Sequence, residues 1–487
     1  MKFRILLVLA LSGSVVSGQP LGSLKTVIVP KPSNLSKYVR DERALIALGK
    51  ALFWDVQASS DGRVACASCH FHAGADHRAQ NQLANRRGSF APNYTLTLDD
   101  YPFHKLADIT NNRSTVLRDS AQIAGSSGLF RRLFSDIIPN AAEEDGVDTS
   151  DAPAFSLGGI NVRRATTRNT PTVINSVFYH RNFWDGRASN IFTGATPFGE
   201  ADLRANARVV SNGQLVAEYV RVDNSSLASQ AVGPALNDVE MSYEGRTWPK
   251  LGKKLLGLRP LARQGVAPDD SVLGSMANPE GSGLSAPYTY LALIQTAFHP
   301  EYWSSKSLLD AGGALLAARL EGASNTSEFT QAEWNFSVFW GLAVQAYQAT
   351  LVSDDSPFDR FSEGDGEALG ALEQRGLNLF RGRGDCDDCH GGAEFTAASF
   401  ANITRQGAVQ RRGNGAFRDR GFFRIGVRPI DEDLGVGGKD DFGQPLSLSV
   451  AQNASAQNSI EGTFKAPTLR NVEFTGPYFH NGGQATL

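Results

Sequence analysis

The sequence is poor in cysteine and methionine, and it has no large excess of charge of one sign. Its 487 residues include four cysteines and three methionines, and the formal net charge is −3. A chain this close to neutral lacks the basic surface that nucleic acid or an anionic membrane surface requires. We therefore expect neither as a partner.

Long apolar runs are also absent beyond the first residues. A positively charged start is followed by the apolar run Ile5–Leu11 and by a small-residue cleavage pattern that ends at Gly18. This arrangement is typical of a secretory signal, and the run is too short to span a bilayer. We expect residues 1–18 to be a signal peptide, and the mature protein to be periplasmic or secreted with no membrane span.

All four cysteines fall into two copies of one pattern, Cys66-Ala-Ser-Cys69-His70 and Cys386-Asp-Asp-Cys389-His390. In the C-x-x-C-H spacing the two thiols form thioether links to haem vinyl groups, and the adjacent histidine binds the iron. Paired C-x-x-C zinc sites usually lie about 15–20 residues apart, unlike these. Thioredoxin-like pairs would leave the repeated histidine unexplained. The pattern therefore predicts two covalently bound haem c groups.

Three segments show helical spacing of apolar residues. They are Arg40–Phe53 with Ser36 as a candidate cap, Glu333–Leu351, and Gly370–Phe380. The first and third each lead into a C-x-x-C-H pattern, so one haem unit lies near each end of the chain. We predict a mainly α fold with two cytochrome c-type haem domains joined by long loops.

The polar run at residues 353–357 marks the expected domain boundary. We predict an N-terminal haem domain over residues 19–352 and a C-terminal haem domain over residues 353–487. Residues from about 200 to 307 are rich in Gly, Ser and Pro with scattered apolar periodicity. We interpret them as a large insertion in the first domain.

Four further motifs accompany the two C-x-x-C-H patterns. They are Arg168-Asn-Thr-Pro171, Phe183-Trp-Asp-Gly-Arg-Ala188, Gln230-x-x-x-Pro234-x-x-x-x-x-Glu240-Met241, and Gly476-Pro-Tyr-Phe-His480. With these motifs in this order, the chain resembles the bacterial di-haem cytochrome c peroxidase family. That family also includes the MauG-type enzymes and the di-haem rubber oxygenases, and the long insertion is more similar to the rubber oxygenase branch.

The resemblance implies a role for several residues. His70 would hold the haem where peroxide or oxygen reacts, and His390 the electron-transfer haem. Trp184 would relay electrons between them, although a buried aromatic more often serves only in packing. Glu240 and Gln230 would lie over the N-terminal haem. A buried glutamate with a raised pKa can move a proton between peroxide oxygens, whereas most glutamates are simply exposed.

The resemblance also implies a calcium ion bound between the domains at Asn169, Thr475 and Pro477, since hard cations prefer oxygen ligands. No carboxylate cluster in the sequence supports this site independently.

The sequence departs from the family pattern in two places. Reductively activated members carry a distal histidine where this chain has Asn161, so we predict a sixth iron position at the N-terminal haem that is open without prior reduction. The family also continues past the last motif and supplies the sixth ligand of the second haem there. We therefore expect a truncated C-terminal domain, with Met276, His299, His480, a less usual group or nothing as that ligand.

Three functions remain open from the sequence. The first is a di-haem peroxidase that takes electrons from a small redox protein and reduces hydrogen peroxide. The second is an oxygenase that uses dioxygen to cleave a hydrophobic substrate such as polyisoprene, which an apolar channel built by the insertion would favour. The third is a non-enzymatic electron carrier, which requires two six-coordinate irons.

Overall fold

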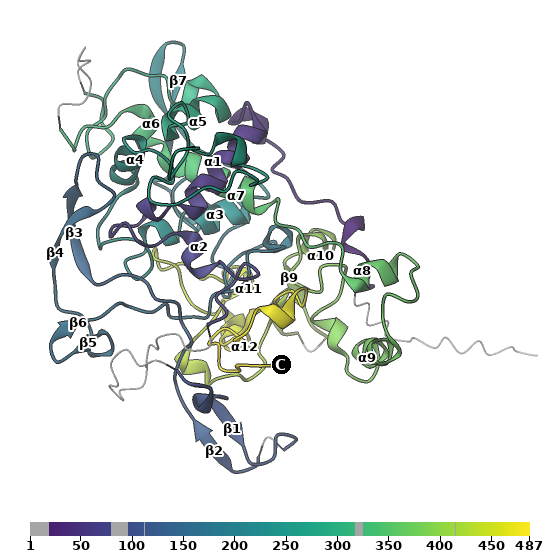
Figure 1. Ribbon diagram of the computed structural model, residues 1–487. Coiled ribbons are helices and arrows are strands. Elements are labelled where there is room, and N and C mark those ends of the chain that lie inside the picture. The colour runs from purple at the N-terminus through teal and green to yellow at the C-terminus, as the bar shows by residue number, and fades with distance from the viewer. Residues whose placement is uncertain (1–18, 79–95, 112, 317–324, 414) are drawn as a thin grey trace, which may run out of the picture.

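The structure is a computed structural model that describes residues 19–78, 96–111, 113–316, 325–413 and 415–487 (Figure 1). The expected signal peptide, residues 1–18, lies outside the described residues. Among the described residues, none of the helices is both long enough and apolar enough to cross a bilayer.

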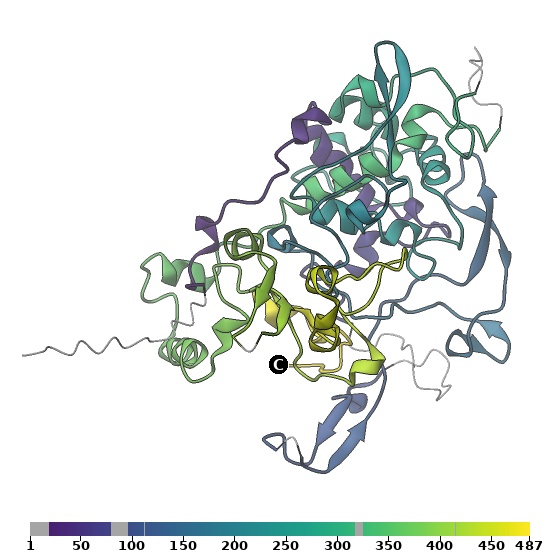
Figure 2. The same cartoon turned by 180° about the vertical axis from the view of Figure 1, so that it is seen from behind.

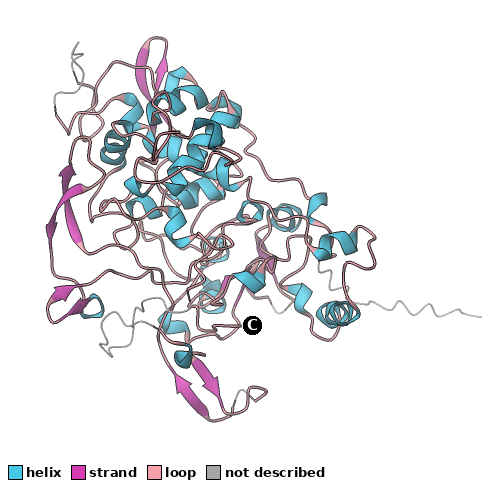
Figure 3. Cartoon of the chain, in the orientation of Figure 1, coloured by secondary structure: helices cyan, strands magenta, loops and turns pink. Residues whose placement is uncertain are grey.

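Twelve α-helices occur in the described residues. They are α1 (Glu42–Trp54), α2 (Cys66–Cys69), α3 (Ser226–Ala231), α4 (Trp248–Leu256), α5 (Tyr290–Ala297), α6 (Gln331–Trp334), α7 (Phe336–Gln348), α8 (Pro357–Ser362), α9 (Ala371–Arg381), α10 (Phe400–Gln406), α11 (Leu448–Gln452) and α12 (Gln457–Ile460). Most of the longer ones gather in one half of the molecule, as Figure 3 shows.

The strands of the described chain pair two by two into small antiparallel sheets. The pairs are β1 (His104–Leu106) with β2 (Val116–Asp119), β3 (Arg132–Ile137) with β4 (Glu144–Asp148), β5 (Ser156–Leu157) with β6 (Ile160–Asn161), β7 (Ala207–Ser211) with β8 (Gln214–Glu218), β9 (Val409–Arg411) with β10 (Phe417–Asp419), and β11 (Phe422–Phe423) with β12 (Phe464–Lys465). The fold is about 30% helix and 15% strand. The prediction of a mainly α fold is therefore met only in part, because the fold is a mixture of helices and small two-stranded sheets.

Helices α1 and α7 form the centre of the larger core. Eight of the thirteen residues of α1 are buried. A Cβ atom on Gly49 would lie only 1.8 Å from the carbonyl oxygen of Ala343, so the two helices approach as closely as their backbones permit. The cap predicted at Ser36 is wrong, because the Asp41 carboxylate accepts the first free amides of the helix. The segment predicted as one helix, Glu333–Leu351, is divided at Asn335 into α6 and α7.

The segment interpreted as an insertion takes part in this core. Trp248 of α4 and Tyr290 of α5 are buried in the same cluster as α1 and α7. Its helices are short and separated by irregular chain, which is why its apolar periodicity is scattered in the sequence.

The C-terminal half is held to the beginning of the described chain. The Asp359 carboxylate at the start of α8 accepts hydrogen bonds from the Leu24 amide and from both terminal nitrogens of Arg470, each at 2.8 Å. Figure 2 shows the N-terminal segment running from α1 across to this half.

Candidate functional site

The first C-x-x-C-H pattern forms the short helix α2 beside the end of α1. Nδ1 of His70 lies 2.8 Å from the carbonyl oxygen of Gly74. This hydrogen bond leaves Nε2 of His70 for a metal, the usual arrangement of a histidine ligand. Burial lowers the pKa of His70, which favours the neutral imidazole that binds iron.

The second pattern has the same arrangement. Nδ1 of His390 lies 3.1 Å from the carbonyl oxygen of Pro467 and 3.3 Å from that of Phe395. Burial lowers the pKa of this imidazole as well. In both histidines a backbone carbonyl therefore orients the ring through Nδ1 and leaves Nε2 available to bind a metal.

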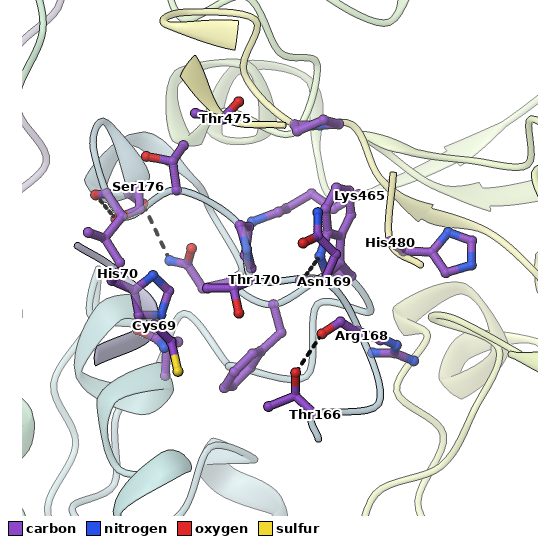
Figure 4. A pocket seen from close by; sticks show the side chains of 18 of the residues that line it. Cys69, His70, Thr166, Arg168, Asn169, Thr170, Ser176, Lys465, Thr475 and His480 are labelled. Carbon is purple, nitrogen blue, oxygen red and sulfur yellow. Dashed lines mark hydrogen bonds between the residues drawn. The ribbon is translucent and has the colours of Figure 1, made fainter. Parts of the chain in front are cut away.

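A single cavity of about 430 Å³ reaches both patterns. Its lining includes Cys66, Cys69 and His70 of the first pattern and Cys389 and His390 of the second, but not Cys386. Figure 4 shows His70 and Cys69 on one side of the cavity, with His480 across from them. Thiol pairs, oriented imidazoles and a shared cavity fit two haem c groups held close together.

Trp184 lies in the wall of the cavity that both patterns line. Its indole Nε1 donates to the carbonyl oxygen of Asn169 at 2.9 Å, and its own carbonyl oxygen accepts from the Lys465 amide at 2.8 Å. The side chain is buried and lines the cavity. It therefore contacts the space that the haems would fill, as well as the protein around it.

Gln230 and Glu240 line the part of the cavity near the first pattern. The Oε1 atom of Gln230 is buried without a hydrogen-bond partner among the described residues. Burial raises the pKa of Glu240, and the nearby guanidinium of Arg187 partly opposes this shift. The wall of the cavity therefore contains a buried amide oxygen without a protein partner and a buried carboxyl group whose pKa is raised.

Two cavity residues were missed from the sequence. Arg187 is the arginine of the Phe-Trp-Asp-Gly-Arg motif, and its guanidinium stacks on the Phe183 ring at 3.9 Å. Lys465 is buried, with Nζ 3.5 Å from the centre of the Tyr179 ring. Burial lowers the pKa of Lys465 to about 7. No local pattern in the sequence indicates that Lys465 is buried.

The three residues of the expected calcium site all line this cavity. Nδ2 of Asn169 donates to the carbonyl oxygen of Pro477 at 2.5 Å, while the Thr475 hydroxyl donates to Val472. A cation at this point would need the Asn169 amide turned so that its oxygen faces the carbonyl. The described residues contain no group of three or more His, Cys, Asp or Glu side chains that suits a metal.

The position at which this chain has Asn161 in place of the family's distal histidine lies in a small hairpin. Asn161 is part of β6, and its Nδ2 donates to the carbonyl oxygen of Thr149 at 2.6 Å. It is not among the described residues that line the cavity.

Of the candidate sixth ligands, His480 alone belongs to the described lining of the cavity. Its ring is buried and stacks on Phe464 with 3.7 Å between centroids. His299 instead hydrogen-bonds the carbonyl oxygen of Ser36 through Nε2, and Met276 packs against the larger core.

Comparison with known proteins gives a consistent result. A family model described as di-haem cytochrome c peroxidase matches residues 43–136 and 139–264. The chain is 22% identical over 406 residues to the cytochrome c peroxidase Ccp of Escherichia coli, covering 81% of this chain and 57% of that protein. It is 34% identical over 145 residues to cytochrome c551 peroxidase of Nitrosomonas europaea, covering 30% of this chain and 33% of that protein.

A further relative is the methylamine utilization protein MauG of Methylorubrum extorquens, 32% identical over 145 residues, or 30% of this chain and 31% of that protein. The chain thus covers less than two thirds of the length of each of these relatives. Among solved structures, a MauG-like protein associated with microbial copper homeostasis matches with a TM-score of 0.42 and 16% identity, over 95% of this chain and 78% of that one. The diheme peroxidase BthA of Burkholderia thailandensis matches with a TM-score of 0.40 and 17% identity, over 92% and 70%.

Proposed function

The chain belongs to the di-haem cytochrome c peroxidase family, and from this premise we propose that it reduces hydrogen peroxide at a haem held by His70. A second haem, held by His390, receives the electrons from a small redox protein. When bound, the two haems supply the electron transfer and the iron at which the O–O bond breaks. The observation that carries this proposal is the single cavity that joins both histidines with Glu240.

Glu240 moves the proton. Reduction of peroxide to two waters needs a proton on the oxygen that leaves first, and a carboxylate beside the peroxide can take the proton from the near oxygen and return it to the far one. Burial raises the pKa of Glu240, so the group exchanges protons more readily near neutral pH than an exposed glutamate does. The unpartnered Oε1 of Gln230 accepts a hydrogen bond from the peroxide and orients it.

Trp184 is positioned as the electron relay between the two sites. Hydrogen bonds to Asn169 and Lys465 hold it on both sides, which fixes the ring in the wall of the cavity. Phe464 and Lys465 line the cavity from the C-terminal half, so the relay borders both halves of the molecule.

The segment interpreted as an insertion contributes few residues to the described lining of the cavity. From the interpreted insertion, the described lining includes Gln230, Ala231, Pro234, Glu240 and Met241. The remaining helices of that segment, α4 and α5, contribute to the larger core. Within the described chain this segment therefore supplies only three apolar residues to the lining, Ala231, Pro234 and Met241, and we take this as support for peroxide rather than a polymer as the substrate.

We also propose that the protein acts after export from the cytoplasm. Covalent haem attachment through both C-x-x-C-H patterns and the signal-like start of the sequence support a periplasmic or secreted protein. An oxygen-ligated calcium ion at Asn169, Thr475 and Pro477 would tie the halves together once the Asn169 amide turns.

The test compares two glutamates in the di-haem protein. We expect Glu240→Gln to lower the rate of peroxide reduction by about 10²–10⁴-fold, the usual contribution of a general acid–base group. Glu244→Gln is the matched control, because Glu244 is four residues away and pairs with Arg131 on the surface. Low-temperature EPR of the oxidised protein should show one high-spin and one low-spin haem. An unchanged rate in Glu240→Gln would contradict the proposal. Two low-spin signals would instead contradict the prediction of a sixth iron position that is open without prior reduction.

A further inference from the structure

A tryptophan at the surface lies directly behind the first haem site. Trp54 is the last residue of α1 and is 36% exposed. Its indole Nε1 donates to the hydroxyl of Tyr347 at 3.0 Å, and Tyr347 is only 5% exposed. The pair therefore joins the surface to the interior of the larger core.

The contact continues from this pair to the haem ligand. The Tyr347 ring lies 5.3 Å from the Phe53 ring between centroids, with an edge-to-face geometry. The Phe53 ring lies 6.3 Å from the imidazole of His70, and Phe53 lines the cavity. Each of these centroid separations is within the range of direct aromatic contact. An electron crosses such short gaps readily, because tunnelling weakens steeply with distance.

The hydrogen bond of Trp54 differs from those of other tryptophans in the described chain. Four indoles donate to backbone carbonyl oxygens: Trp184, Trp248, Trp303 and Trp340. Trp54 donates instead to a second oxidisable side chain. Packing alone does not require a phenol as the partner of a half-exposed indole.

A nearby charge favours oxidation at Trp54 over Tyr347. The ammonium of Lys50 lies 5.8 Å from the centre of the Tyr347 ring and is fixed by a 2.6 Å ion pair with Asp270. A cation beside a ring disfavours removal of an electron from that ring. The radical left by one-electron oxidation should therefore reside on the indole of Trp54, which is exposed to solvent, rather than on Tyr347.

We propose that Trp54 is a second oxidation site, at which organic one-electron donors too large for the cavity are oxidised at the surface. The inference rests on the proposed peroxide chemistry at the His70 haem. The indole loses one electron, through Tyr347 and Phe53, to the oxidised haem. The donor then gives one electron back to the indole and leaves as its radical cation. Two donors and two solvent protons balance the reduction of one hydrogen peroxide to two waters.

The experiment uses the di-haem protein, hydrogen peroxide and the bulky dye ABTS as the donor. We expect Trp54→Phe to lower steady-state ABTS oxidation by about tenfold, a change of about 1.4 kcal/mol in the activation free energy. Reduction of peroxide by the pre-reduced protein in a single turnover should keep its rate, because that reaction needs no external donor. Trp303→Phe is the matched control, since Trp303 is a partly buried indole bonded to the Phe298 carbonyl.

Peptide mass spectrometry supplies a readout that does not depend on turnover or on any variant. When the unmodified protein receives peroxide without a donor, we expect added oxygen on the peptide that contains Trp54 and none on that of Trp303. ABTS oxidation that is equal in Trp54→Phe, or an unmodified Trp54 peptide, would overturn the second site while leaving single-turnover peroxide reduction intact. Failure of the single turnover itself would overturn the proposed function and this inference with it.

Discussion

The helices that precede the two C-x-x-C-H patterns occupy very different surroundings. Helix α1 buries eight residues against α5 and α7, and its Gly49 touches the backbone of α7. Every residue of α9 is described, and none is buried. Two of its leucines, Leu372 and Leu379, are 72% and 57% exposed. The same local pattern is thus preceded by a helix packed into the core at the first site, and by a helix with no buried residue at the second.

This difference indicates how each site acquires its stability. Burial of an apolar side chain stabilises a fold by about 1.5–3 kcal/mol relative to exposure, so α1 is held without any cofactor. An amphipathic helix whose apolar side chains stay exposed lacks that contribution. We infer that the haem proposed at Cys386 and Cys389 would supply the apolar surface that α9 needs.

The largest expected effect comes from removing each haem in turn. We expect Cys386→Ser with Cys389→Ser to abolish amide protection in α9, because the helix loses its apolar partner. The matching pair, Cys66→Ser with Cys69→Ser, should abolish peroxide reduction yet leave α1 protected within its own core. Hydrogen exchange read by mass spectrometry on both variants checks this. Full protection of α9 without its haem would contradict the comparison.

Buried ion pairs test whether the two halves unfold separately. The Arg246 guanidinium contacts the Glu144 carboxylate at 2.6 Å beside α4, with both side chains fully buried. Arg470 pairs with Asp359 at 2.8 Å in the C-terminal half, with side-chain exposures of 4% and 0%. Removing one partner of a buried pair typically costs about 3–5 kcal/mol where the other charge is left unpaired. Glu144, however, would keep the buried ammonium of Lys254 at 2.5 Å after the loss of Arg246.

We therefore expect Arg470→Met to lower the free energy of unfolding by about 3–5 kcal/mol, and Arg246→Met to lower it by less because Lys254 still pairs with Glu144. Denaturant titration measures both changes. Hydrogen exchange should place the loss around α1 and α4 for the first variant and around α8 for the second. Arg131→Met, which breaks an exposed pair with Glu244, is the control and should cost less than about 1 kcal/mol. Losses that spread evenly over both halves would show that the molecule unfolds as one unit.

Acid should weaken the link between the C-terminal half and the start of the chain. Burial alone would raise the pKa of Asp359, but hydrogen bonds from Arg470, Ser356 and the Leu24 amide outweigh it and hold the pKa at about 2. A carboxyl with a depressed pKa stabilises the fold fully above its unfolded value of about 3.9, and this stability is lost as the pH falls toward 2.

At about 1.36 kcal/mol for each pKa unit, the expected loss between pH 4 and pH 2 is on the order of 2 kcal/mol. Amide exchange in α8 and near Leu24, followed as a function of pH, measures it. Asp359→Asn should be less stable at pH 7 and should not show this particular acid dependence. A wild-type profile in α8 that is flat from pH 4 to pH 2 would exclude the proposed linkage.

The two haem patterns and α1 were predictable because each depends on local sequence. The C-x-x-C-H spacing specifies its own chemistry, and the apolar spacing up to Phe53 predicts a helix that ends at Trp54 in the structure. The burial of Lys465 was not predictable, because it depends on β11 and β12 pairing between residues far apart in the chain. The core position of α4 was missed for the same reason, since its partners lie in α6 and α7.

The smallest expected effects lie at the helix starts. The Asp41 side chain caps α1 by accepting from the amides of Arg43 and Ala44. At the start of α9, Glu373 accepts from the Gly370 amide, but Gly370 has no side chain to accept in return. The φ of −67° and ψ of 165° at this glycine suit any residue. The first helix is therefore capped as well as packed, whereas α9 has only half of a reciprocal cap and no buried residue.

We expect Asp41→Ala to destabilise α1 by about 1 kcal/mol, the usual cost of losing an N-cap. Gly370→Ser should stabilise α9 by a few tenths of a kcal/mol, because its hydroxyl can accept from the Glu373 amide and complete a reciprocal cap. Amide exchange in each helix of the di-haem protein measures both changes. If Gly370→Ser increases amide protection in α9 only while the haem is attached, the haem determines whether the helix forms and the cap adds only to its first turn. A gain without the haem would mean that α9 has helical stability of its own, which would narrow the contrast between the two sites.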